Sequence, residues 1–250
     1  MKFVVIALVV SLFAIEASAY SLYKTSSGKN IRWTKSTIEV VLDTSMATLA
    51  TKESVEKVVR ESFELWVIDA SLPISFVVVW DECKEAHDDS NNCIIACHKR
   101  AKCYDRPQEK GGTTFINVSP STGAIHDADI VLNADDWMWS VDGSNEHGLD
   151  LFRVMVHEIG HFIGIDHSEE KDAIMYPSLL MGEHRAVELD DDDILAGKTL
   201  YADFVEMDES DNGAVCSIVH VGERAGHGGG FIGLFLIGIA IVGLVKFRGR

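Results

Sequence analysis

The spacing of apolar and polar residues changes along the first part of the chain, and each spacing predicts a different element. Residues 38–42 (IEVVL) and 74–80 (ISFVVVW) are short runs rich in β-branched and aromatic residues, which is typical of buried strands. Residues 54–67, between them, have apolar side chains at helical spacing and predict an amphipathic helix. The apolar stripe of this helix consists of Val55, Val58, Val59, Phe63 and Trp66.

The middle of the chain predicts loops and short strands. Residues 81–110 are polar and cysteine-bearing, and we interpret them as a loop-like insertion. Short β-type segments are expected at 113–118 and 129–132, followed by a polar loop with two tryptophans at 133–149.

Two helices are expected in the last third of the body. Asp150 has the side chain of an N-cap for an apolar-rich helix that extends to about Ile163. Gly164 then suits the left-handed residue that ends a helix. The final helix is expected to begin in the cluster Asp190–Asp193, because carboxylates stabilise a helix N-terminus, and to reach Tyr201.

Both ends of the chain predict export and attachment to a surface. Residues 1–19 have a positive start, an apolar stretch and a small-x-small site, which indicates a secretory signal peptide cut before Tyr20; an uncleaved anchor is the alternative. Residues 231–245 carry no charge and predict a transmembrane helix or a sorting signal. The remaining parts are a short N-terminal segment at 20–29, the body at 30–204, a Gly- and Asp-rich stalk at 205–230 and a basic tail at 246–250.

Charge and cysteine content narrow the partners and the compartment. The formal net charge of −17 disfavours nucleic acid and anionic membrane surfaces as partners. In an exported protein the cysteines favour disulfides, and the four clustered ones allow three pairings. A zinc knot of Cys93, Cys97, His98 and Cys103 is an alternative with atypical spacing. The five cysteines are Cys83, Cys93, Cys97, Cys103 and, far from the others, Cys216.

The stretch HEIGHFIGIDH carries the chemistry. His157 and His161 are four residues apart and share one face of the predicted helix, so both imidazoles can reach one zinc ion. Gly164 can turn the chain back and present His167 as a third ligand. Three protein ligands leave a fourth position for water, which is typical of catalytic rather than structural zinc.

Glu158 suggests what such a site does. Next to His157, its carboxylate can take a proton from zinc-bound water and later give it to a leaving amine, which is peptide-bond hydrolysis without a covalent intermediate. The alternatives are a helix with structural histidines and a surface adhesion or sensor protein that binds zinc without catalysis. Zinc binding alone would not require Glu158.

The same residues resemble a known family. HEIGHFIGIDH resembles the metzincin zinc signature, and AIMYP resembles the methionine turn of that group. Ser168, which follows the third histidine, resembles the residue found there in the matrixin branch of the metzincins. Three further segments also resemble matrixins: IRWTKSTIEVVL, FELWVIDASLPISFVVV and LDDDDILAGKTLY. The resemblance covers residues 30–204. It implies an α/β (α+β) catalytic domain, with a twisted, mostly parallel five-stranded sheet, an active-site helix and a small C-terminal subdomain.

The resemblance also implies roles for single residues. Met175 would form an apolar floor under the imidazoles, and Tyr176 and Pro177 would line the specificity pocket. Asp192 and Asp193 match the pair of carboxylates that supports the methionine turn or a new N-terminus.

Some family features are replaced here. The cysteine-switch motif PRCGxPD is not in the sequence, so we expect latency to be controlled by other means. Ile130 stands where a histidine of the structural zinc site would be. One group of acidic residues allows a calcium site, although an acidic, solvated loop is the interpretation that we favour. The group consists of Asp127, Asp129, Asp135 and Asp136. The overall prediction is a zinc endopeptidase that acts on protein substrates outside the cytoplasm, anchored by its C-terminal segment.

Overall fold

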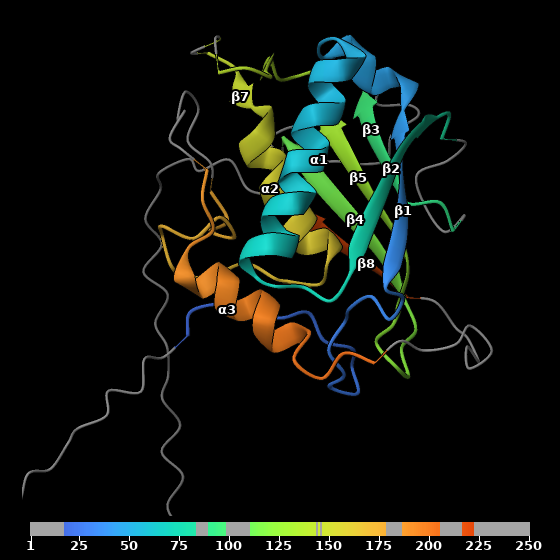
Figure 1. The fold of residues 1–250 in the computed structure, drawn as a ribbon, viewed down its shortest axis with the longest axis vertical. Helices are drawn as coiled ribbons and strands as arrows, with labels where there is room; N and C mark the ends of the chain where they lie inside the picture. Colours follow the sequence, from blue (N-terminus) through green and yellow to red (C-terminus); the bar gives the residue numbers. More distant parts are fainter. Residues whose placement is uncertain are drawn as a thin grey trace, which may run out of the picture.

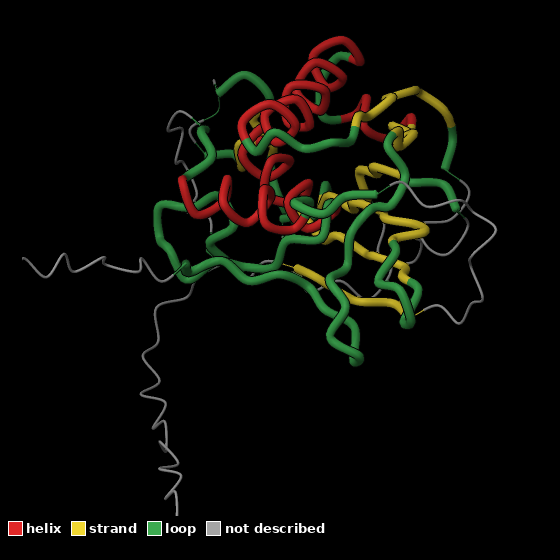
Figure 2. Tube along the Cα trace, turned by 60° about the horizontal axis from the view of Figure 1, so that its bottom comes forward, coloured by secondary structure: helices red, strands yellow, loops and turns green. Residues whose placement is uncertain are grey.

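A sheet with helices on one side forms the body in the computed structural model, which describes residues 18–83, 90–98, 111–143, 145, 147–178, 187–205 and the backbone of 217–222. Figures 1 and 2 show the helices gathered to one side of the strands. The elements are β1 (Thr37–Asp43), a 3-10 helix (Thr44–Thr48), α1 (Lys52–Asp69), β2 (Ser75–Asp81), β3 (Cys93–Cys97), β4 (Gly112–Val118), β5 (Ile125–Asn133), β6 (Trp139–Ser140), β7 (Leu149–Asp150), α2 (Leu151–Phe162), α3 (Asp191–Leu200) and β8 (Ser217–Gly222).

The strand order confirms the predicted fold class. The main sheet has the order β2-β1-β3-β5-β4-β8. The first four strands are parallel to their neighbours, whereas β4 is antiparallel to β5. These five strands and α2 are the mostly parallel sheet and active-site helix expected from the sequence. The sixth strand, β8, pairs antiparallel with β4 and comes from the segment that we expected to be a stalk without regular structure.

The loop-like prediction for residues 81–110 is wrong at β3. Cys93–Cys97 forms an inner strand between β1 and β5, with four of its five residues buried. A strand with both faces covered has no alternation of apolar and polar residues, so its pattern is easily missed. Its two cysteines also behave as small apolar residues in the interior.

The cysteine pairing excludes the zinc-knot alternative. Cys83 and Cys93 form a disulfide, and Cys97 is disulfide-bonded too. Nε2 of His98 contacts the hydroxyl of Thr48. A cysteine in a disulfide cannot act as a thiolate ligand, so Cys93 and Cys97 cannot bind the zinc ion of the alternative zinc knot. Cys103 and Cys216 lie outside the described residues.

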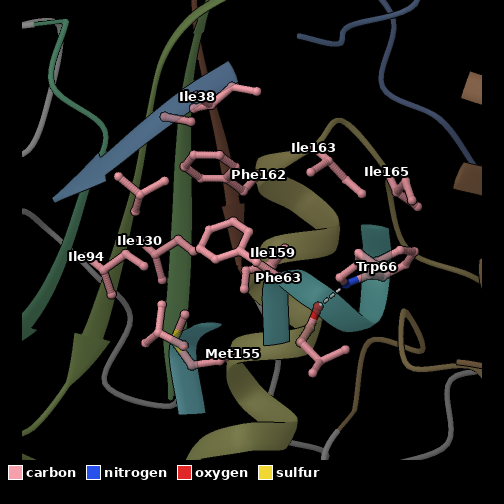
Figure 3. Close-up of a cluster of buried hydrophobic side chains, with 14 of the residues drawn as sticks. Ile38, Phe63, Trp66, Ile94, Ile130, Met155, Ile159, Phe162, Ile163 and Ile165 are labelled. Atoms are coloured by element: carbon pink, nitrogen blue, oxygen red, sulfur yellow. Dashed lines mark hydrogen bonds between the residues drawn. The ribbon is translucent and has the colours of Figure 1, made fainter. Parts of the chain in front are cut away.

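The main core lies between the sheet and the helices α1 and α2. Figure 3 shows Phe63 of α1 and Phe162 of α2 among aliphatic side chains from the sheet, and the two rings meet edge to face. The indole N–H of Trp66 donates to the carbonyl of Val156 over 2.7 Å, which ties α1 to α2. This packing fixes the position of α2 against the sheet.

Both ends of α2 are held by named groups. Asp150 caps the helix as predicted, since its carboxylate accepts from the N–H of Arg153. Gly164 has a φ of 105°, the left-handed conformation expected after the helix.

Side chains from distant segments hold the last carbonyl groups of α2. The indole N–H of Trp33 donates to the carbonyl of Phe162 (3.0 Å), and the hydroxyl of Tyr201 donates to the carbonyl of Ile163 (2.9 Å). The C-terminal end of α2 therefore has little freedom to move.

Within the part of the chain that the structure describes, no helix has the length and apolar character needed to cross a membrane. Residues 1–17 of the predicted signal peptide (residues 1–19) and the apolar run 231–245 lie outside the described residues.

Candidate metal centre

Three histidine side chains converge at the C-terminal half of α2. His157 and His161 are on the helix and buried, and His167 returns to them after the turn at Gly164. Nε2 of His161 lies 3.1 Å from Nε2 of His157 and 3.2 Å from Nε2 of His167. Zinc–nitrogen bonds of 2.0–2.1 Å in a tetrahedron separate the nitrogens by about 3.3 Å. The three imidazoles therefore fit one zinc ion.

The opposite ring nitrogens set the tautomers of two of the imidazoles. Nδ1 of His157 lies 2.6 Å from the carbonyl oxygen of Ile174, and Nδ1 of His161 lies 2.8 Å from that of Ile165. A carbonyl only accepts, so each Nδ1 carries the proton and each Nε2 offers its lone pair. Burial lowers the pKa of His157 to about 4, although the hydrogen bond to the Ile174 carbonyl acts in the opposite direction. The imidazole is therefore neutral at pH 7 and able to bind metal.

Glu158 is fully buried and faces β4. Its Oε2 accepts a hydrogen bond from the hydroxyl of Thr114 over 2.5 Å. Gly112 leaves room for the carboxyl group, because a Cβ at this position would lie 2.6 Å from Oε1 of Glu158. The strand thus orients the carboxylate next to the histidine cluster. Thr114 and Gly112 belong to none of the motifs in the sequence analysis, so their contact with Glu158 was not predicted.

The methionine turn lies directly against α2. Met175 is buried, and its sulfur approaches the backbone of Gly160 so closely that a Cβ there would be 2.2 Å from it. Asp193 of α3 accepts from the backbone N–H groups of Ile174 (2.7 Å) and Met175 (3.1 Å). Burial raises the pKa of Asp193 to about 6 and these donors oppose that rise, so the carboxyl group is ionised at neutral pH. Support of the methionine turn by this carboxylate is confirmed.

The N-terminal segment runs antiparallel to the chain that carries the third histidine. The sequence did not predict this backbone pairing, although it matched Asp192 to a carboxylate that could support a new N-terminus. The backbone N–H of Tyr23 donates to the carbonyl of Gly164, and that of Asp166 donates to Ser21. Asp192 accepts from the N–H of Ala19 (2.8 Å) and from the hydroxyl of Ser168 (2.6 Å). In Figure 1 this segment is the blue trace that passes beside α3.

The other expected residues do not form a second centre among the described residues. His157, His161 and His167 are the only set of three potential ligand side chains brought together there. Asp127 and Asp129 are buried in β5, and Ile130 of the same strand belongs to the hydrophobic core. Calcium binding by these aspartates stays a prediction. Tyr176 and Pro177 follow Met175 at half-buried positions.

Comparison with known proteins agrees with this geometry. The matrixin family model matches residues 32–202. Karilysin of Tannerella forsythia is 32% identical over 174 residues, 68% of this chain and 33% of karilysin. Metalloendoproteinase 1-MMP of Arabidopsis thaliana is 32% identical over 174 residues, 68% of this chain and 44% of that protein. Matrilysin of Homo sapiens is 28% identical over 150 residues, 59% of this chain and 51% of matrilysin.

The chain spans about a third to a half of the length of these relatives. The matched region contains the three converging histidines, Glu158 and the methionine turn. On this match the chain belongs to the matrixin family.

Proposed function

We propose that this chain is a zinc-dependent endopeptidase that cleaves protein substrates, with His157, His161 and His167 as zinc ligands. The observation that carries the proposal is the convergence of three Nε2 atoms, two from α2 and one from the segment after it, beside the buried carboxylate of Glu158. The names of two relatives, metalloendoproteinase and matrilysin, belong to proteins that share this region and support the same activity here.

The residues of the chain have distinct tasks in this proposal. His157, His161 and His167 would hold a zinc ion, which would supply Lewis-acid chemistry for the scissile carbonyl and lower the pKa of bound water to roughly 7. Glu158 takes the proton from the attacking water and hands it to the leaving amine. Thr114 holds the carboxylate of Glu158 in one orientation by its hydrogen bond.

Residues of the methionine turn complete the proposed site. Met175 forms the apolar floor behind the imidazoles, which is consistent with its complete burial. Tyr176 and Pro177, next in the chain, are proposed to line the wall of the pocket that selects the substrate side chain.

We place the enzyme outside the cytoplasm, held at a surface by residues 231–245. The disulfide between Cys83 and Cys93 supports this setting, because disulfides persist in oxidising compartments and are rare in the cytosol. The predicted signal peptide at residues 1–19 supports the same route.

The test compares Glu158→Gln with Glu169→Gln, which removes an exposed carboxylate two residues after His167. In Glu158→Gln, cleavage of a general protein substrate should fall by at least roughly 10²-fold while zinc content stays near one per chain. Glu169→Gln should keep both properties. Equal cleavage by the Glu158→Gln and wild-type chains would overturn the mechanism.

The same measurements decide on the alternative of a zinc-binding adhesion or sensor protein. That protein would hold one zinc per chain without cleaving any substrate in a broad peptide library, before or after substitution of Glu158.

A further inference from the structure

The hydroxyl of Tyr23 lies at the rear of the metal centre, on the side of His161 that faces away from the other two imidazoles. Its Oη is 3.2 Å from Nδ1 of His161, and the two ring centroids are 5.8 Å apart. The same Nδ1 lies 2.8 Å from the carbonyl oxygen of Ile165. One ring nitrogen of His161 therefore faces two oxygen atoms.

The proton positions follow from what each group can donate. With Nε2 turned toward a metal, Nδ1 of His161 carries the ring proton and must act as the donor. The oxygen of Tyr23 is then an acceptor, and its own proton needs another partner. The carboxylate of Asp166 lies near the phenol and can serve as that partner. A phenol with its ordinary pKa of about 10 is protonated at neutral pH, so Tyr23 has a proton to donate.

The backbone fixes Tyr23 in this place. Its N–H donates to the carbonyl of Gly164 (3.2 Å), and its own carbonyl accepts from the N–H of Ile31 (2.9 Å). Asp166 in turn accepts from the N–H of His167 over 2.7 Å. Asp166 is thus held by the backbone of His167, next to the phenol that contacts His161.

We propose that Tyr23, aligned by Asp166, is a positioning residue for the metal ligand His161. The hydrogen bond to Nδ1 restrains rotation of the imidazole and increases its strength as a ligand, which is the usual effect of partners behind a metal-bound histidine. Tyr23 lies beyond the predicted cleavage before Tyr20, so the exported chain retains it. The inference rests on the proposed zinc site and extends it to the N-terminal segment.

The test is the variant Tyr23→Phe, which removes one oxygen atom and keeps the ring. The zinc dissociation constant, measured on the full chain by competition with a chelator, should rise by about tenfold or more. The absorption bands of the cobalt-substituted protein should shift. The value of kcat should fall while KM stays unchanged, because Tyr23 lies behind the ligand and away from the substrate side.

Tyr20→Phe is the matched control. Tyr20 lies in the same segment, but its hydroxyl contacts Thr199 of α3 and no histidine. Its removal should leave zinc affinity and the cobalt spectrum unchanged. The thermal midpoint of the metal-free protein should be similar in both variants, which separates an effect on the ligand from a loss of packing.

Asp166→Asn tests the direction of the hydrogen bonds. Asparagine retains an oxygen that can accept from the His167 N–H but is a weaker acceptor for the phenol proton. In the Tyr23→Phe background this substitution should add little further loss of zinc affinity. Fully additive losses would overturn the link between Asp166 and His161.

Two outcomes overturn the inference itself. Zinc affinity in Tyr23→Phe equal to that of the wild type would do so, and so would an equal loss in Tyr20→Phe. A wild-type chain that binds no zinc would instead overturn the proposed function on which the inference depends.

Discussion

The hydroxyl of Thr114 donates to Oε2 of Glu158 over 2.5 Å, and it also lies 3.1 Å from the backbone carbonyl of the same residue. This contact joins β4 to the middle of α2, between residues 44 positions apart in the chain. A side chain of the sheet therefore helps to orient the carboxylate that we propose as general base.

Thr114→Val should lower kcat by about tenfold, a part of the roughly 10²–10⁴-fold contribution of acid–base catalysis. Valine keeps the shape of threonine but cannot hold the carboxylate by a hydrogen bond. Steady-state kinetics on a peptide substrate would measure the change, and zinc content should stay constant. Thr113→Val is the matched control, because the hydroxyl of Thr113 donates to the carbonyl of Gly112 and not to Glu158. A comparable loss in both variants would contradict the specific role of Thr114.

Gly160→Ala should destabilise the body by about 1–3 kcal/mol through overpacking. The new methyl group would lie 2.2 Å from the sulfur of Met175 and 2.9 Å from the indole of Trp66, so the helix or the methionine turn must move. Urea unfolding would measure the loss. In a double-mutant cycle, Met175→Ala should make room for the methyl group, and the two losses should be less than additive. Strict additivity would show that the two residues do not compete for the same space.

Asp193→Asn should detach the methionine turn from α3 and cost about 2 kcal/mol of unfolding free energy. The carboxylate accepts from three backbone N–H groups, those of Ile174, Met175 and Asp190, and an amide nitrogen in its place cannot accept. Asp191→Asn removes an exposed charge from the same helix turn and should cost at most about 0.5 kcal/mol. Equal losses in the two variants would point to helix-end charge as the cause.

The metal-free protein should lose stability as the pH falls from about 6.5 to about 4. In this window an unfolded His157 is protonated, whereas the folded residue, with its pKa lowered to about 4 by burial, is neutral. The unfolded state then binds more protons, so acid favours unfolding, by up to roughly 3 kcal/mol from this group. Urea unfolding at several pH values would measure the slope. The difference between the wild type and His157→Leu isolates the contribution of this histidine, and identical slopes would contradict the prediction.

Local spacing accounts for a large part of the fold and for the identity of the site. The four-residue separation of His157 and His161 and the turn at Gly164 are properties of one continuous segment, so periodicity and helix-end rules describe them before any packing is known. The same is true of α1, with its apolar stripe, and of β1 and β2. The reaction class follows from these side chains because their geometry is set within a few turns of chain.

Contacts between distant segments were decided by packing alone. Tyr23 reaches His161 across 138 positions, and Thr114 reaches Glu158 from a strand that carries no chemical motif. Cys93–Cys97 looked like a loop because an inner strand needs no alternation once both faces are covered. No spacing along the chain encodes which strand lies behind a helix or which segment lies behind a histidine. The contacts of Tyr23 and Thr114 form only when the sheet, α2 and the N-terminal segment pack together. They orient the side chains of His161 and Glu158 at the site.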